Sequence, residues 1–209
     1  MRESRRPPLF EREALSLKKD SGLFFVLSNL LCTFADMNRM KGWLVWLGRL
    51  HRCRGFGIQS PTDYGFVRYV INEHWPYYAY QRLHGEDWLT RKLGRLYFRL
   101  ANWRQPTTMR PDRYMAWWKA GCGKVRFEEH PGRLELVRVD ITADVLALLD
   151  RCDAASVLVV EGIWRDWARW RSIVDDGRTG ICYDLYYCGI VFLIKIVSNI
   201  VIRLISDKL

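Results

Sequence analysis

Four acidic residues follow apolar runs that are typical of β-strands, and their carboxylates could bind a ligand. They are Glu128, Glu129, Asp140 and Glu161. The clearest case is Glu161, which follows Val157–Val160, an aliphatic run that predicts a strand buried on both faces. Ligands in open α/β sheets bind outside the carboxyl ends of the strands. We therefore expect Glu161 at the ligand-binding edge of a sheet.

A second group of residues suits the binding of phosphates and bases. Residues 39–104 contain twelve Lys and Arg against four Asp and Glu, a net charge of +8 in a chain whose total is +10. The same segment holds an aromatic patch, Tyr77, Tyr78 and Tyr80. Arginines would contact phosphates while the tyrosines stack on bases, which predicts a non-catalytic module for nucleic acid or an anionic surface. The alternative is a solvated helical cap whose rings belong to the core, and only phosphate-driven binding would weaken steeply with salt.

The cysteines and histidines do not predict a metal site. The six cysteines are Cys32, Cys53, Cys122, Cys152, Cys182 and Cys188. They contain no CxxC pair, and none lies at ligand spacing from one of the four scattered histidines. We expect them to be small buried side chains in a reducing, cytoplasmic protein.

Two helices are predicted in the basic segment. Ser60 is suited to cap the first, with Pro61 at its first position. The second spans residues 88–103, with leucines along one side, and we expect its arginines, Arg99 included, on the remaining surface.

Strands and helices alternate from residue 105 onward. Strands are predicted at 107–109, 125–127, 134–139 and 157–160, helices at 111–120, 142–150 and 164–174, and a closing hairpin at 180–186 with 188–194. This order is typical of a Rossmann-like α/β fold, a mostly parallel sheet with helices on both faces. The predicted domains are a leader at 1–38, a basic helical lead at 39–104, the α/β domain at 105–194 and an apolar tail at 195–209.

An apolar run lies near each end of the chain. Residues 22–35 could be a signal-peptide core, a short span, or translated upstream sequence before a start at Met37 or Met40, and we favour the last. Residues 189–205 carry Lys195 near their middle. Because a central charge disfavours a membrane helix, we expect the last strand to end near Ile194, with no integral membrane segment.

Five stretches of the chain form a pattern that is found in a known family: Gly55–Pro61, Tyr77–Tyr80, Val157–Ile163, Asp184–Tyr186 and Gly189–Phe192. In these stretches the chain resembles the bacterial class I S-adenosylmethionine-dependent methyltransferases, in an O-methyltransferase-like branch of Bacteroidetes. The resemblance covers roughly residues 49–193 and implies transfer of a methyl group from S-adenosylmethionine to an oxygen or nitrogen nucleophile of an unknown acceptor.

The resemblance also assigns roles to the acidic residues. Glu128 or Glu129 would hold the ribose hydroxyls, with a solvated loop as the alternative, and Asp140 would contact adenine or help Thr142 cap the next helix. Glu161 matches the aspartate of metal-dependent members, but Gly162 replaces their second oxygen ligand, which argues against a divalent metal.

One departure from the family concerns the cofactor loop. The segment after the first predicted strand, 106–112, lacks the glycine-rich turn that lets the backbone approach the cofactor. We interpret Gly121 and Gly123 as the end of a helix instead, because a strand follows them. The sequence therefore leaves open whether methyl transfer is retained.

Overall fold

The computed structural model describes residues 44, 60–84, 87–193 and 200–203. The chain divides into two compact units, residues 1–47 and 48–209, and every element named below belongs to the second. The predictions for the leader at 1–38, for residues 45–59 with most of the Gly55–Pro61 motif, and for 194–199 and 204–209 lie outside the described residues.

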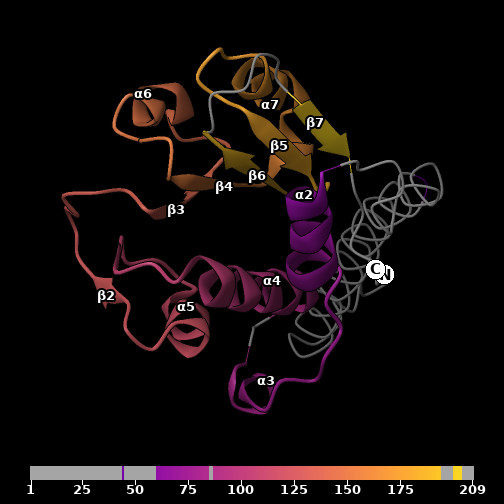
Figure 1. The fold of residues 1–209 in the computed structure, drawn as a ribbon, viewed down its shortest axis with the longest axis vertical. Helices are drawn as coiled ribbons and strands as arrows, with labels where there is room; N and C mark the ends of the chain where they lie inside the picture. Colours follow the sequence, from indigo (N-terminus) through magenta and orange to yellow (C-terminus); the bar gives the residue numbers. More distant parts are fainter. Residues whose placement is uncertain (1–43, 45–59, 85–86, 194–199, 204–209) are drawn as a thin grey trace, which may run out of the picture. The chain divides into compact units, whose positions relative to one another are not determined.

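The larger sheet has five strands and is mixed (Figure 1). Its strands are β3 (Leu136–Asp140), β4 (Val157–Glu161), β5 (Ile181–Asp184), β6 (Cys188–Phe192) and β7 (Ile200–Arg203). They lie in the order β3-β4-β6-β5-β7, in which β3 with β4 and β5 with β7 are parallel and the other two pairs are antiparallel. The predicted hairpin of β5 and β6 is confirmed. Because it inserts β6 between β4 and β5, the sheet is not mostly parallel and a Rossmann-like arrangement is not clear.

A second, two-stranded sheet stands apart from the first. It pairs β1 (Thr108–Met109) in parallel with β2 (Arg126–Phe127). Its link to β3 includes the Glu135 carboxylate, which accepts hydrogen bonds from the Thr107 amide at 2.6 Å and the Thr107 hydroxyl at 2.9 Å. The strand preceding Glu128 and Glu129 is therefore not part of the five-stranded sheet.

Most helical elements of the described residues are short. They are α2 (Pro61–Phe66), the π-helical η2 (Val67–Ile71), α3 (Ala79–Arg82), α4 (Trp88–Arg104), α5 (Met115–Gly121), α6 (Val145–Leu149), the 3-10 helix η3 (Ile163–Arg165) and α7 (Trp167–Val174). The predicted start of α2 is confirmed, because the Ser60 side chain accepts from the Asp63 amide and Pro61 opens the helix. The helix predicted at 88–103 is α4, and Asp87 caps it.

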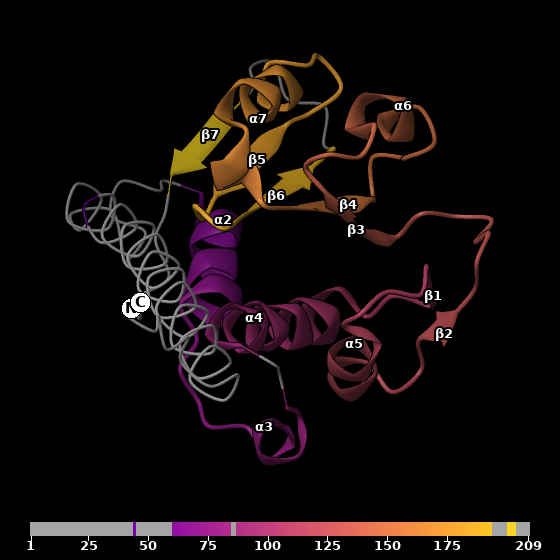
Figure 2. The same cartoon turned by 180° about the vertical axis from the view of Figure 1, so that it is seen from behind.

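Helices pack on both faces of the sheet, as predicted (Figure 2). Val157 and Val159 join a core cluster with residues of α2, α4 and α5, while Leu158 and Val160 join a second cluster with α6 and α7. All five residues of β4 are buried, which confirms a strand covered on both faces. The coarse α/β class therefore holds.

Glycines allow α4 and α5 to cross closely. A side chain on Gly94 would overlap the Trp117 ring, and one on Gly121 would overlap the Phe98 carbonyl. Gly121 is the last residue of α5, and Cys122 follows it in an extended conformation. The prediction that a helix ends at this point is therefore confirmed to within one residue, with Cys122 as the C-cap, and the missing side chain of Gly121 also allows the helix crossing.

Two further expectations concern the end of the chain and the cysteines. The prediction that the last strand ends near Ile194 is wrong, because β7 adds residues 200–203 alongside β5. Within the described ranges, no helix is both long and apolar enough to cross a membrane. Cys122, Cys182 and Cys188 are buried free thiols, as expected, and Cys152 is partly buried.

Candidate functional site

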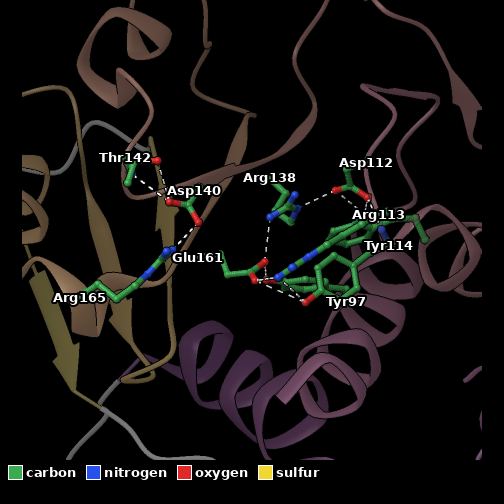
Figure 3. Close-up of polar contacts among 10 residues, drawn as sticks. Tyr97, Asp112, Arg113, Tyr114, Arg138, Asp140, Thr142, Glu161 and Arg165 are labelled. Carbon is green, nitrogen blue, oxygen red and sulfur yellow. Dashed lines mark hydrogen bonds and ion pairs between the residues drawn. The ribbon is translucent and has the colours of Figure 1, made fainter. Parts of the chain in front are cut away.

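The structure brings Asp140 and Glu161 together at the carboxyl ends of β3 and β4. The two residues are partners in the parallel register of these strands. Figure 3 shows that each carboxylate contacts different arginines and that the Glu161 carboxylate faces α4 and the start of α5. The predicted strand edge thus forms, but its two acids belong to different networks.

The Glu161 carboxylate lies at the centre of a buried network. Glu161 is 5% exposed, and its Oε2 accepts from Arg138 Nη1 at 2.8 Å and from the Tyr97 hydroxyl at 3.2 Å. Its Oε1 is paired with Arg113 and accepts from the Tyr114 hydroxyl at 3.5 Å. Both oxygens of Glu161 are therefore engaged by side chains of this protein.

Asp112 extends the network to a second carboxylate. Arg138 Nε donates to Asp112 Oδ2 at 2.9 Å, so one guanidinium bridges Asp112 and Glu161. Asp112 Oδ1 also accepts from the Tyr114 amide at 2.7 Å and from Trp118 Nε1 at 3.0 Å. Charges buried in this way are stable only when paired and hydrogen-bonded, so the network ties β3 and β4 to α4 and α5.

The two tyrosines of the network stay neutral. Burial, together with the charge of Glu161, raises the pKa of Tyr114 to about 12. Burial also raises the pKa of Tyr97 well above its usual value. Both phenols are therefore hydrogen-bond donors to Glu161 at neutral pH, and neither is suited to act as a base there.

Asp140 is held by its own neighbours. It is paired with Arg165, and its Oδ1 accepts from the Thr142 amide at 3.1 Å and the Thr142 hydroxyl at 2.9 Å. Thr142 does not cap the next helix, because α6 begins at Val145 and the Asp144 side chain caps it. Gly162 has a φ of 81°, and the Arg165 guanidinium occupies the space that a side chain there would need.

The acids that the resemblance assigns to the ribose lie elsewhere. Glu128 and Glu129 are exposed and follow β2, in the two-stranded sheet. They do not share a strand edge with Asp140 and Glu161. The four predicted cofactor residues therefore do not form one site.

Two of the three predicted tyrosines line a basic hollow. Its volume is about 640 Å³, and its lining includes four aromatic and four cationic residues: Trp75, Tyr77, Tyr80, Trp88, Arg91, Lys92, Arg95 and Arg99. Among its described lining residues, Glu73 is the only acid. Tyr78 is 89% exposed and does not line the hollow.

Aromatic packing fixes one wall of this hollow. The rings of Tyr77 and Tyr80 are 5.4 Å apart, and both contact Phe98 of the core. The Arg95 guanidinium lies 5.3 Å from the centre of the Tyr80 ring. The Lys92 ammonium lies 5.1 Å from the Trp88 ring, and burial lowers the pKa of Lys92 to about 8. Cations and aromatic faces are thus already in contact within the hollow.

Arg99 has a positioning role that the sequence did not reveal. It is 8% exposed, contrary to the expectation of a surface arginine. Its Nε donates to the Val70 carbonyl at 2.6 Å and its Nη2 to the Ile71 carbonyl at 3.2 Å. Arg99 therefore satisfies the carbonyls at the end of η2 and holds that end against α4. Its place between Phe98 and Leu100, both buried, was the only available signal.

Neither similarity to known proteins nor a cluster of metal ligands assigns a function to these residues. No protein-family model, no curated protein and no solved structure matches the chain. In the part of the chain that the structure describes, no three His, Cys, Asp or Glu residues gather as metal ligands would.

Proposed function

We propose that this protein is a non-catalytic binding module for nucleic acid, with the basic aromatic hollow as its site. The observation that carries the proposal is the convergence of four cationic and four aromatic side chains on one hollow. Phosphates would lie against the arginines and bases against the rings, the combination found in proteins that bind single strands.

The arginines of α4 are suited to contact phosphates. Arg91 and Arg95 are exposed, both line the hollow, and a separation of four residues places them on the same side of the helix. Among the described residues that line the hollow, the single acid, Glu73, is outnumbered by the cations, Arg91, Lys92 and Arg95 among them. The hollow therefore favours an anion.

The aromatic residues offer faces on which bases could stack. Trp75 and Trp88 are large exposed side chains at the hollow, whereas Tyr77 and Tyr80 are half-buried against the core. Stacking on such rings is worth about 1–3 kcal/mol per base and tolerates any sequence. A binding module of this kind would accordingly show little sequence preference.

Methyl transfer from S-adenosylmethionine in a Rossmann-like domain remains a prediction from the resemblance. The parallel pair β3 and β4 supports it, but Glu161 is fully engaged and Glu128 and Glu129 lie apart. Calorimetric titration with S-adenosylmethionine tests it, since micromolar binding would restore it as the leading function.

The binding proposal is tested by fluorescence anisotropy of a labelled single-stranded oligonucleotide with the full chain. The variant Arg91→Gln/Arg95→Gln should weaken binding and lower the slope of log K against log salt by about 1.4, because two phosphate contacts worth about 0.7 each are lost. The matched control is Arg151→Gln/Arg171→Gln, which removes the same charge at exposed positions outside the hollow. Equal losses in both variants would contradict the proposal. Tight binding to anionic vesicles without oligonucleotide binding would favour an anionic surface instead.

A further inference from the structure

A second hollow adjoins the first. Its volume is about 510 Å³, and Arg68 and Tyr69 of η2 line it. The stretch Glu73–Pro76 lines both hollows and so forms a ridge between them. The two hollows are therefore neighbours along the surface, separated by four residues of chain.

The ridge at 73–76 has a fixed conformation. Glu73 Oε1 accepts from the His74 amide at 2.9 Å and from the Trp75 amide at 3.1 Å. Pro76 restricts the backbone at the other end of the ridge. Arg99, bonded to the end of η2, holds the helix that leads into it. A binding surface ordered in advance loses less entropy when a ligand arrives.

Exposed aromatic rings stand on the ridge and beyond it. Trp75 is 71% exposed and Tyr69 is 64% exposed, and neither belongs to the buried core. Arg68 beside Tyr69 is also exposed. The second hollow thus also has an arginine and a tyrosine in its lining, while Trp75 lines both hollows.

We propose that the two hollows form one track for a single-stranded nucleic acid, which crosses the ridge at Trp75. This inference rests on the function proposed above and extends it to the form and length of the ligand. Unpaired bases can reach Tyr69 and Trp75, whereas the bases of a duplex are stacked on one another and hidden from them. The phosphates of a strand on this path would pass Arg68 on one side of the ridge and Arg91 on the other.

The track predicts that affinity depends on strand length. We would measure binding of the full chain to a dinucleotide, a tetranucleotide and an octanucleotide of thymidylate, and to a duplex of the longest. The octanucleotide should bind at least about fivefold more tightly than the dinucleotide, because stacking on the second hollow adds to the first. It should also bind more tightly than the duplex.

Variants separate the two hollows. Tyr69→Leu should remove most of the gain of the octanucleotide and leave dinucleotide binding unchanged, whereas Arg91→Gln should weaken the binding of every strand. The matched control is Tyr64→Leu, since Tyr64 is an exposed tyrosine that lines neither hollow. All three positions are exposed, and unchanged thermal unfolding would verify that the variants fold.

The outcomes separate the track across two hollows from the nucleic-acid binding on which it rests. Equal affinity for all lengths, or no effect of Tyr69→Leu on the octanucleotide, would overturn the track while leaving the first hollow as a nucleotide site. Tighter binding of the duplex would overturn the single-stranded path alone. Failure of every strand to bind would overturn both proposals.

Discussion

At the residue scale, Glu161 shows how a carboxylate at a strand end can serve stability. Four side chains donate to it, and they come from α4, from the segment before α5 and from β3. Removal of its charge would leave Arg138 buried beside Asp112 alone. The consequence belongs to folding more than to ligand binding.

Glu161→Gln should lower the free energy of unfolding by about 1–3 kcal/mol, because it breaks the buried pair with Arg138, which then keeps only Asp112 as its partner. Urea denaturation measures the loss. The control is Asp140→Asn at the half-exposed pair with Arg165, where a loss of about 1 kcal/mol or less is expected. Similar losses at the two positions would contradict the structural role assigned to Glu161.

Because of Tyr114, the stability of the fold should fall at alkaline pH. The pKa of Tyr114 is raised from 10.0 to about 12 on folding, so the folded protein favours the neutral phenol. This contribution is complete below the unfolded pKa and is lost as the pH rises from about 10 toward about 12. Tyr114→Phe should flatten that decline in unfolding free energy, whereas Tyr78→Phe, at an exposed ring, should retain it. An unchanged decline in Tyr114→Phe would refute the assignment.

At the element scale, the crossing of α4 and α5 supports both the Glu161 network and one wall of the basic hollow. Tyr97 and Trp118 stack across this crossing with ring centres 4.7 Å apart. Tyr80 contacts Phe98 of α4, and its ring centre lies 6.1 Å from that of Trp117 of α5. A change in the distance between the helices would therefore disturb both regions.

The same substitution should have opposite effects in two helices. Gly94→Ala should destabilise the fold by about 1–3 kcal/mol, because the new methyl group overlaps the Trp117 ring. Gly65→Ala in α2 meets open space and should stabilise by about 0.5–1 kcal/mol, because alanine favours helix. Thermal or urea unfolding compares them, and a loss at Gly65 equal to that at Gly94 would contradict the packing argument.

Local signals in the sequence predicted elements well. The cap at Ser60, the leucine side of α4 and the aliphatic run of β4 each depend on neighbouring residues, and each was predicted at nearly its observed place. The pairing of strands was not predictable in this way. The insertion of β6 between β4 and β5, and the addition of β7, depend on contacts between distant parts of the chain.

The same difference between local signals and distant contacts applies to the candidate site. Tyr77 and Tyr80 were predicted from an aromatic patch beside basic residues, and they do line a basic hollow. The engagement of Glu161 could not be predicted, because its partners lie 23 to 64 residues away in the sequence. The role of Glu73 and Arg99 in shaping the ridge was hidden for the same reason, since side-chain bonds to backbone leave no periodic pattern.

At the scale of the whole molecule, charge and shape coincide. The segment 39–104 carries a net charge of +8 within a chain of +10. Its described residues, 60–84 and 87–104, hold seven Lys and Arg against three Asp and Glu, a net charge of +4, and line both hollows. Helix α5 and the strands β4, β5 and β6 provide the scaffold against which the described part of this segment packs. We propose that the residues lining the two hollows bind the phosphates of a nucleic acid strand.

The most direct test is the affinity of the full chain for a labelled single-stranded oligonucleotide, measured by anisotropy over a series of salt concentrations. The logarithm of the binding constant should fall linearly with the logarithm of the salt concentration, with a slope of about −0.7 for each phosphate contacted. The slope should be shallower for Arg91→Gln/Arg95→Gln. An absence of binding at low salt, or an affinity independent of salt and of these two arginines, would contradict the proposal.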